Sequence, residues 1–312
     1  MTDHNMERLV ATSDSNDTAF TITTQTGSLA AVHGEPAGVA RATVVLIPGS
    51  GPIDRDGNAK QLKVDIQRQL SVALVGAGFA TVRWDKRGVG RSAGSFLATG
   101  FHDGVADALV AVDWALALGR PVVVIGHSEG SAIAARLAAE RPELAAIVLL
   151  SGYARSGREV LRWQAESLGG HLPLPVRAIL RLMRTDLRRQ AEKTHQKILA
   201  TTSDVARVGG VKLNAKWFRE FIEYDPLADL AGSAQPVLAL TGSFDLQTPP
   251  EDLQAIAAAR TAPTETVLVE GLSHILRRQD TPSVRAYKKD VRRPIDPEVI
   301  DLIVAWVTRT VG

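Results

Sequence analysis

The residues Pro121–Ala139 read PVVVIGHSEGSAIAARLAA, a short apolar run followed by a glycine-flanked serine and an alanine-rich run. The run 122–125 is β-branched and bounded by Pro and Gly, which predicts a fully buried strand of a parallel sheet. The alanine-rich run carries apolar residues one helical turn apart and predicts a helix packed on that sheet. Between them, residues 126–130 form G-x-S-x-G, the pattern of a sharp strand-to-helix turn that exposes a serine. Ser128 is therefore the candidate nucleophile, at the carboxyl edge of the sheet beside a helix N-terminus that favours negative charge.

A serine hydroxyl needs a base to take its proton, and the base needs an orienting acid. In folds with this turn, the chain order is Ser, then Asp or Glu, then His. Asp245 follows a predicted strand at 236–240, and His274 follows another at 265–269. Because chemistry in open α/β sheets gathers outside the carboxyl ends of the strands, we expect both residues to lie near Ser128. The other six histidines fit this order poorly: His4, His33, His102, His127, His171 and His195.

Acyl transfer also needs N–H groups aimed at the oxyanion of the tetrahedral intermediate. One is expected from the backbone of Glu129, the residue after the nucleophile, and the other from Ser50, whose flanking glycines allow close backbone approach to a substrate. Nearby, the run Asp54–Asp56 has two open interpretations. It lines the acyl or leaving-group side of the site, or it pairs with Lys86, Arg87 or Arg91 and fixes two loops.

Strands and helices alternate along most of the chain, which predicts an α/β fold with a mostly parallel, doubly wound sheet. Predicted strands occupy 20–24, 29–33, 42–47, 79–84 and 146–150 in addition to those above, and the first two flank a hairpin turn. Asp103 is expected to cap a helix that runs to Leu118. We divide the chain into a flexible tail at 1–18, an α/β core at 19–150 and 236–312, and an insertion at 151–235.

The insertion 151–235 carries no predicted buried strand, and an amphipathic helix is expected where apolar residues recur between Val176 and Leu187. It holds 14 Lys and Arg against 9 Asp and Glu, although the net charge of the whole chain is only +2. We interpret the insertion as a helical cap or lid over the site, and the alternative is an outrigger packed elsewhere. Its excess of basic residues is explained by a solvated helix face.

The near-neutral charge gives no general attraction to nucleic acid or to acidic membranes. The chain has no cysteine, which excludes disulfides and thiolate chemistry, and no metal-ligand motif is visible, so we expect no metal. The pattern G-x-G-x-x-A at 88–93 follows a strand but is not followed by a clear helical period, so no nucleotide cofactor is expected. Neither a signal peptide nor an apolar run long enough to span a membrane is present, and a cytoplasmic location is expected.

The blocks IPGSGPIDRDGN, DKRGVGRS, GHSEG, TGSFDLQTP and EGLSHIL, in this order, resemble the α/β-hydrolase superfamily. They are similar in particular to bacterial serine carboxylesterases and to serine aminopeptidase-like and dienelactone hydrolase-like enzymes. The resemblance covers about 44–274 and implies nucleophile Ser128, acid Asp245, base His274 and oxyanion donors Ser50 and Glu129. It departs from the family at Pro48, where many relatives have His before the glycine.

The sequence therefore favours a metal-independent serine esterase that acts on a small-molecule acyl ester through an acyl-enzyme. A serine aminopeptidase-like peptidase and an acyl-CoA thioesterase are the enzymatic alternatives, because fold alone does not name the substrate. An exopeptidase needs an acid or amide cluster for the substrate α-amine, and no such cluster is evident in the insertion. A binding protein that kept the fold without the chemistry is disfavoured by the ordered Ser, Asp and His.

Overall fold

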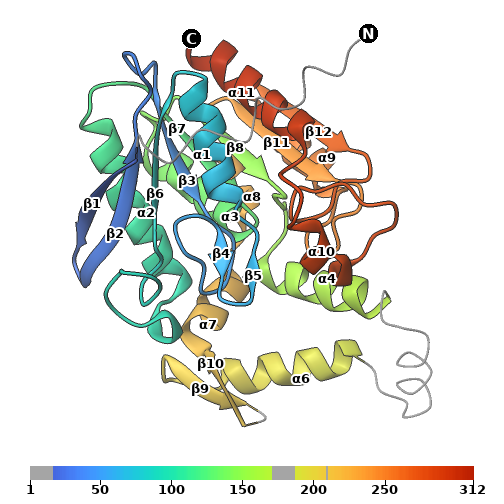
Figure 1. The fold of residues 1–312 in the computed structure, drawn as a ribbon. Coiled ribbons are helices and arrows are strands. Elements are labelled where there is room, and N and C mark those ends of the chain that lie inside the picture. The colour runs from blue at the N-terminus through green and yellow to red at the C-terminus, as the bar shows by residue number, and fades with distance from the viewer. Residues whose placement is uncertain (1–16, 171–186, 209) are drawn as a thin grey trace.

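The computed structural model describes residues 17–170, 187–208 and 210–312, and it is organised around a central sheet of eight strands (Figure 1). The strands lie side by side in the order β1, β2, β6, β3, β7, β8, β11, β12. The first two pair antiparallel with each other, β2 pairs antiparallel with β6, and all later pairs are parallel. Their bounds are β1 Asp17–Thr24, β2 Gly27–Gly34, β3 Thr43–Ile47, β6 Ala80–Trp84, β7 Val122–His127, β8 Ala146–Leu150, β11 Val237–Gly242 and β12 Thr264–Val269.

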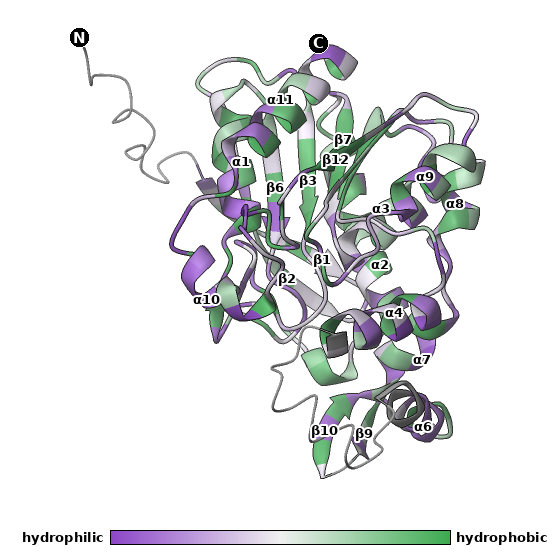
Figure 2. Ribbon diagram, turned by 90° about the vertical axis from the view of Figure 1, so that its right-hand side faces the viewer, coloured by the Kyte–Doolittle hydropathy of each residue, from purple (hydrophilic) through white to green (hydrophobic). Residues whose placement is uncertain are grey.

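The parallel strands are apolar because both faces of the sheet are covered. Every residue of β3, β6, β7, β8 and β11 is buried. Side chains alternate between two cores, so Val45 and Val124 pack with helices α2 and α3, whereas Val44 and Val123 pack with α1 and α11 on the opposite face. The main helices are α1 Ile66–Gly76, α2 Phe101–Leu116, α3 Glu129–Glu140, α9 Asp252–Ala258 and α11 Pro297–Val311. Figure 2 shows the hydrophobic colouring of β3 and β7 between these layers.

The mostly parallel sheet with helices on both faces is the predicted fold class, and the strands expected from the sequence are present. Asp103 differs in detail from the expectation. The first helical residue of α2 is Phe101, and Asp103 sits two positions inside the helix, where its carboxylate accepts a hydrogen bond from the Gly100 N–H at 2.7 Å. Asp103 still accepts a hydrogen bond from a free N–H group at the helix N-terminus, but it does so from the first turn rather than from the cap position.

Between β8 and β11, the described part of the insertion contains helices and one small hairpin. The sequence predicted no buried strand here and did not indicate the small hairpin in which β9 Val205–Val208 and β10 Val211–Asn214 pair antiparallel. Both strands are only four residues long, and β10 is mostly exposed, so no buried apolar run announces them. The helices are α4 Gly157–Gly170, α6 Leu187–Leu199, α7 Ala215–Glu223 and α8 Pro226–Gly232. Most of the helix expected between Val176 and Leu187 lies outside the described residues.

The segment Asn214–Glu220 of the insertion is hydrogen-bonded to the loop that precedes α2 and to the start of α2. The Asn214 side chain donates to the carbonyls of Phe96 and Thr99 at 2.8 and 2.6 Å. Lys216 pairs with Asp103 at 2.7 Å, and the Glu220 carboxylate accepts from the His102 N–H at 2.9 Å. In contrast, α6 and the β9–β10 hairpin lie farthest from the sheet in Figure 1.

Smaller elements complete the described chain: β4 Asn58–Ala59, β5 Leu62–Lys63, the short helix α10 Tyr287–Asp290, and the 3₁₀ turns η1 Phe96–Ala98 and η2 Val284–Ala286. Among the helices of the described residues, none combines the length and apolar character needed to cross a membrane.

Candidate active site

Ser128 stands on a strained turn between β7 and α3. Its backbone has φ 56° and ψ −119°, a conformation that L-residues rarely adopt. The two flanking glycines are required by space. A Cβ on Gly126 would lie 2.0 Å from the carbonyl oxygen of Gly130, and one on Gly130 would lie 2.4 Å from that of Ile47 in β3. The G-x-S-x-G pattern therefore reflects a turn that packs too closely on its own helix and on β3 to admit a side chain at either glycine.

Asp245 and His274 come from the loops after β11 and β12 and meet at the carboxyl edge of the sheet. The His274 Nδ1 atom lies 2.8 and 3.0 Å from the two carboxylate oxygens of Asp245. The carboxylate also accepts hydrogen bonds from the Gln247 N–H, the Thr248 N–H and the Thr248 hydroxyl at 2.8 to 2.9 Å. Burial alone would raise the pKa of Asp245, but the charge and hydrogen bond of His274, together with further hydrogen bonds such as that from the Gln247 N–H, lower it.

His127 supports the loop that carries His274. Its Nε2 atom donates to the His274 carbonyl oxygen at 2.9 Å, and the centroids of the two rings are 4.9 Å apart. Burial, followed by repulsion from His274, lowers the pKa of His127 to about 3, so its ring is neutral. His127 was not expected to act as a base, and this geometry agrees, but nothing in the sequence indicated its contact with the loop of His274.

His274 uses Nδ1 for Asp245, which leaves Nε2 as the ring atom that can take a proton. Among the described residues, no hydrogen bond joins the Ser128 hydroxyl to this nitrogen. Such catalytic hydrogen bonds are often long before substrate binds and tighten in the complex. The structure thus brings Asp245 and His274 together at hydrogen-bond distance.

The two expected oxyanion donors flank Ser128 from different elements. Ser50 lies in the loop after β3, and this loop touches the turn closely, because a Cβ on Gly49 would lie 3.2 Å from the Ser128 Cβ. Glu129 begins α3. Within the described part of the chain, neither the Ser50 N–H nor the Glu129 N–H donates to another protein group. Both donors are therefore available to a substrate.

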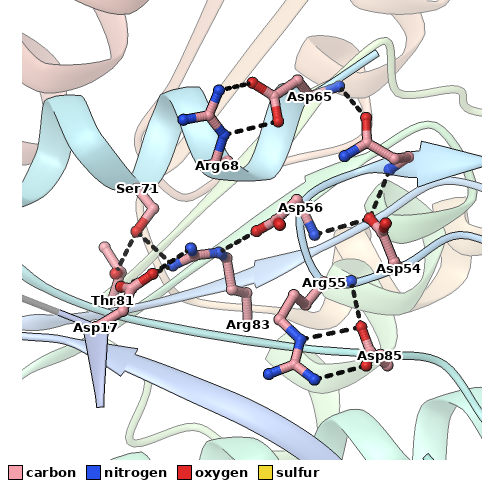
Figure 3. Close-up of polar contacts among 11 residues, drawn as sticks. Asp17, Asp54, Arg55, Asp56, Asp65, Arg68, Ser71, Thr81, Arg83 and Asp85 are labelled. Atoms are coloured by element: carbon pink, nitrogen blue, oxygen red, sulfur yellow. Dashed lines mark hydrogen bonds and ion pairs between the residues drawn. The ribbon is translucent and has the colours of Figure 1, made fainter. Parts of the chain in front are cut away.

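The Asp54–Asp56 run fixes loops, as one of its two interpretations proposed, but the expected partners were wrong (Figure 3). Arg55 forms a bidentate pair with Asp85 at 2.6 and 3.0 Å. Among the described residues, Lys86, Arg87 and Arg91, the expected partners, do not pair with the acids of the run. Asp56 pairs with Arg83 at 3.0 Å, and Arg83 also holds Asp17 at the start of β1.

Asp85 joins the two loops through backbone as well as side-chain contacts. Its carboxylate accepts from the Arg55 N–H at 2.9 Å and from the Arg91 N–H at 3.0 Å. Burial would raise the pKa of Asp85, but the hydrogen bonds from Arg55 and Arg91 keep it below its ordinary value. These contacts join the loop after β3 to the loop after β6 at Arg55 and Arg91.

A cluster that the sequence analysis did not predict surrounds the Glu129 side chain, which is only 6% exposed. Lys86 Nζ lies 2.8 Å from Glu129 Oε2 and 2.6 Å from the carbonyl oxygen of Gly49. Trp217 of α7 donates its indole N–H to Glu129 Oε1. The sequence offers one signal for this cluster, which is the carboxylate directly after Ser128. A carboxylate at a buried turn requires a partner.

A pocket borders Glu129, Pro48 and Gly51. Its walls are mostly apolar: Ile47, Trp84, Phe96, Phe101, Ile133 and Trp217. Its four charged side chains form two pairs, Lys86 with Glu129 at 2.8 Å and Arg87 with Asp107 at 2.6 Å. The pocket therefore presents apolar surface with internally balanced charge, next to the expected oxyanion donors.

The fold and the Ser, Asp and His loops at one sheet edge define an α/β-hydrolase. The chain belongs to the family described as serine aminopeptidase, S33, which matches residues 64–280. This family supports a hydrolase enzyme of the α/β-hydrolase class. No curated protein matched the sequence.

Solved esterase structures share the fold at low sequence identity. Est1E from Butyrivibrio proteoclasticus has a TM-score of 0.62 and 18% identity, covering 94% of this chain and 98% of its own. The esterase domain of a Rhodothermus marinus protein has a TM-score of 0.59 and 20% identity, with coverage of 95% and 99%. The Pyrococcus furiosus esterase Pf2001 has a TM-score of 0.60 and 16% identity, with coverage of 95% and 91%.

Proposed function

We propose that this hydrolase cleaves carboxylic esters through an acyl-enzyme formed on Ser128, with His274 as base and Asp245 as the acid that orients it. The observation that carries the proposal is the Asp245–His274 Nδ1 contact at 2.8 Å beside the strained turn that presents Ser128. Asp245 fixes the His274 tautomer with its proton on Nδ1, so Nε2 is free to accept the serine proton.

In the first half of the reaction, Ser128 Oγ bonds to the acyl carbon while its proton passes to His274 Nε2. The oxygen of the tetrahedral intermediate takes up negative charge and accepts hydrogen bonds from the Ser50 and Glu129 N–H groups. The carbon–oxygen bond to the alcohol then breaks, and His274 gives the proton to the leaving alcohol. In the second half, water attacks the acyl carbon while its proton passes to His274 Nε2. The bond between the acyl carbon and Ser128 Oγ then breaks, His274 returns the proton to Oγ, and the carboxylic acid leaves.

The pocket supports an ester rather than a peptide substrate. An aminopeptidase must bind a charged α-amine, which requires an available carboxylate or amide cluster. Both carboxylates that line the pocket, Glu129 and Asp107, are already paired with Lys86 and Arg87. An uncharged acyl or alcohol group fits these walls without breaking either ion pair.

A peptidase is kept as the alternative function, because the matching family is described as serine aminopeptidase. A panel of p-nitrophenyl esters, acyl-CoAs and aminoacyl anilides separates the three substrate classes by kcat/KM. We expect the esters to be preferred. A higher kcat/KM for the aminoacyl anilides would replace the esterase assignment with a peptidase, and one for the acyl-CoAs would replace it with a thioesterase.

Covalent labelling with a fluorophosphonate probe tests the nucleophile independently of the substrate. We expect the wild type to be labelled and Ser128→Ala to be unlabelled, with both proteins folded by circular dichroism. Equal labelling of the two proteins would contradict the assignment of Ser128, and a folded wild type that is not labelled would favour a binding protein.

A further inference from the structure

Lys86 contacts the backbone of the loop that carries the expected oxyanion donor Ser50. Its ammonium group donates to the Gly49 carbonyl oxygen at 2.6 Å and is held by the Glu129 carboxylate at 2.8 Å. The Lys86 side chain is 18% exposed, so these contacts are largely shielded from water. Shielding makes a charge-assisted hydrogen bond stronger than it would be at the surface.

The Gly49 carbonyl and the Ser50 N–H belong to the same peptide unit. In a planar trans peptide, the C=O and N–H bonds point to opposite sides, so an atom that fixes the carbonyl direction also fixes the N–H direction. The loop itself provides little restraint, because glycine flanks Ser50 on both sides and Gly51 has a φ of +97°. Lys86 therefore supplies a restraint that the local sequence lacks.

We propose that Lys86 is a positioning residue of the oxyanion hole, which orients and polarises the Gly49–Ser50 peptide so that its N–H faces the developing oxyanion. The inference rests on the proposed function, because Ser50 is a donor only if Ser128 performs acyl transfer. Glu129 holds the ammonium group in place, and the Trp217 indole N–H occupies the other carboxylate oxygen. A cation bound to the carbonyl also withdraws electron density from the peptide and makes its N–H a better donor.

A simpler role for Lys86 is to neutralise Glu129 near a site where negative charge develops. Two variants distinguish the roles. Lys86→Met removes the donor to Gly49 and leaves the Glu129 carboxylate unpaired, whereas Lys86→Met with Glu129→Gln removes the donor without leaving a buried charge. The double variant is also the safer one to fold, since an unpaired buried carboxylate is strongly destabilising.

The readouts are the kcat and KM for a p-nitrophenyl ester, the inhibition constant of a trifluoromethyl ketone that forms a tetrahedral adduct, and the rate of fluorophosphonate labelling. In the double variant, we expect kcat to fall about 10- to 100-fold, somewhat less than on loss of a whole donor. Ketone affinity and labelling rate should fall by a similar factor, and KM should change less than about twofold, because the contact acts on the oxyanion rather than on the bound ester.

Lys216→Met is the matched control, because Lys216 also forms a partly buried pair, with Asp103 at 2.7 Å, but does not touch the Gly49–Ser50 loop. We expect its ketone affinity and labelling rate to match those of the wild type. Wild-type values in the double variant, or a rise in KM with kcat unchanged, would overturn the role of Lys86. Wild-type kcat in the double variant with a low kcat in Lys86→Met alone would assign charge neutralisation instead. If the fluorophosphonate probe does not label Ser128 in the wild type, the proposed function is refuted, and the inference with it.

Discussion

His127 Nε2 donates a hydrogen bond to the carbonyl oxygen of His274 at 2.9 Å, which ties the end of β7 to the loop that carries the expected base. The residue before Ser128 thus braces the loop of His274, the proposed base. His127 makes this contact with a neutral ring, since its pKa is lowered to about 3 by burial and by His274. Protonation of His127 would place a charge in a buried site, so the stability of the fold depends on pH.

The free energy of unfolding should decrease as the pH falls from about 6.5 towards 3. An unfolded histidine takes up a proton near pH 6.5, whereas folded His127 does not until about pH 3, so acid favours the unfolded state across this window. The lowered pKa of Asp245 acts in the same direction below about pH 4. Urea unfolding at a series of pH values measures the slope.

His127→Gln should reduce that slope by up to about 1.4 kcal/mol per pH unit, the effect of one proton. His102→Gln is the matched control, because it makes the same replacement at an exposed position. An unchanged slope in His127→Gln would show that other groups cause the acid sensitivity.

Ser128→Ala should lose kcat by a factor on the order of 10⁴ or more while keeping its melting temperature within a few degrees. The hydroxyl makes no hydrogen bond to a protein group in the described residues, so its removal breaks nothing that stabilises the fold. Steady-state kinetics and thermal unfolding check both parts. A variant with wild-type turnover would remove Ser128 from the mechanism.

Gly130→Ala should destabilise the protein and abolish activity, because the new Cβ would lie 2.4 Å from the Ile47 carbonyl oxygen and push β3 from α3. Gly76→Ala at the end of α1 is the control, since a Cβ there meets no atom within 4 Å. We expect a lower melting temperature for the first variant only. Equal melting temperatures would mean that the turn relaxes without cost.

Arg55→Met should lower the free energy of unfolding by about 3 kcal/mol, because it leaves the Asp85 carboxylate, 4% exposed, without its cation. Arg309→Met is the control. Its pair with Glu265 is about half exposed on both sides, and such pairs contribute less than about 1 kcal/mol. Urea unfolding of the two variants at one pH measures the difference, and equal values would count against a buried Arg55–Asp85 clamp.

Trp217→Ala should shift the ester preference towards larger groups, because Trp217 forms a wall of the pocket from the insertion. The kcat/KM ratio for p-nitrophenyl octanoate over acetate measures the shift. Phe218→Ala is the matched control, since the neighbouring side chain packs in the small cluster around Ile198 and does not line the pocket. The same ratio in both variants would show that Trp217 does not set the selectivity.

The core and its catalytic loops could be predicted because local signals agree with the fold. Apolar runs mark β3, β7 and β8, and the glycines around Ser128 mark a turn that admits no larger side chain at either flanking position. The order of Asp245 and His274 after their strands then places them at one edge.

The ion pairs could not be predicted in the same way. The run Asp54–Asp56 faces the run Asp85–Arg87, and several complementary pairings satisfy their charges equally well. Only the three-dimensional register selects Arg55 with Asp85 and Arg83 with Asp56. Trp217 and Glu129 are 88 residues apart, and no period or motif links them. The β9–β10 hairpin lacks the buried alternation by which strands are recognised.

The shared Glu129 carboxylate has a consequence for protein engineering. Lys86 from the core and Trp217 from the insertion each donate a hydrogen bond to one of its two oxygens. The insertion is therefore hydrogen-bonded to the turn that presents the serine. Grafting a different cap between β8 and β11 would remove the indole donor and leave one oxygen of a buried carboxylate unsatisfied. A functional chimera would therefore need either a replacement donor in the new cap or a smaller, uncharged residue after Ser128.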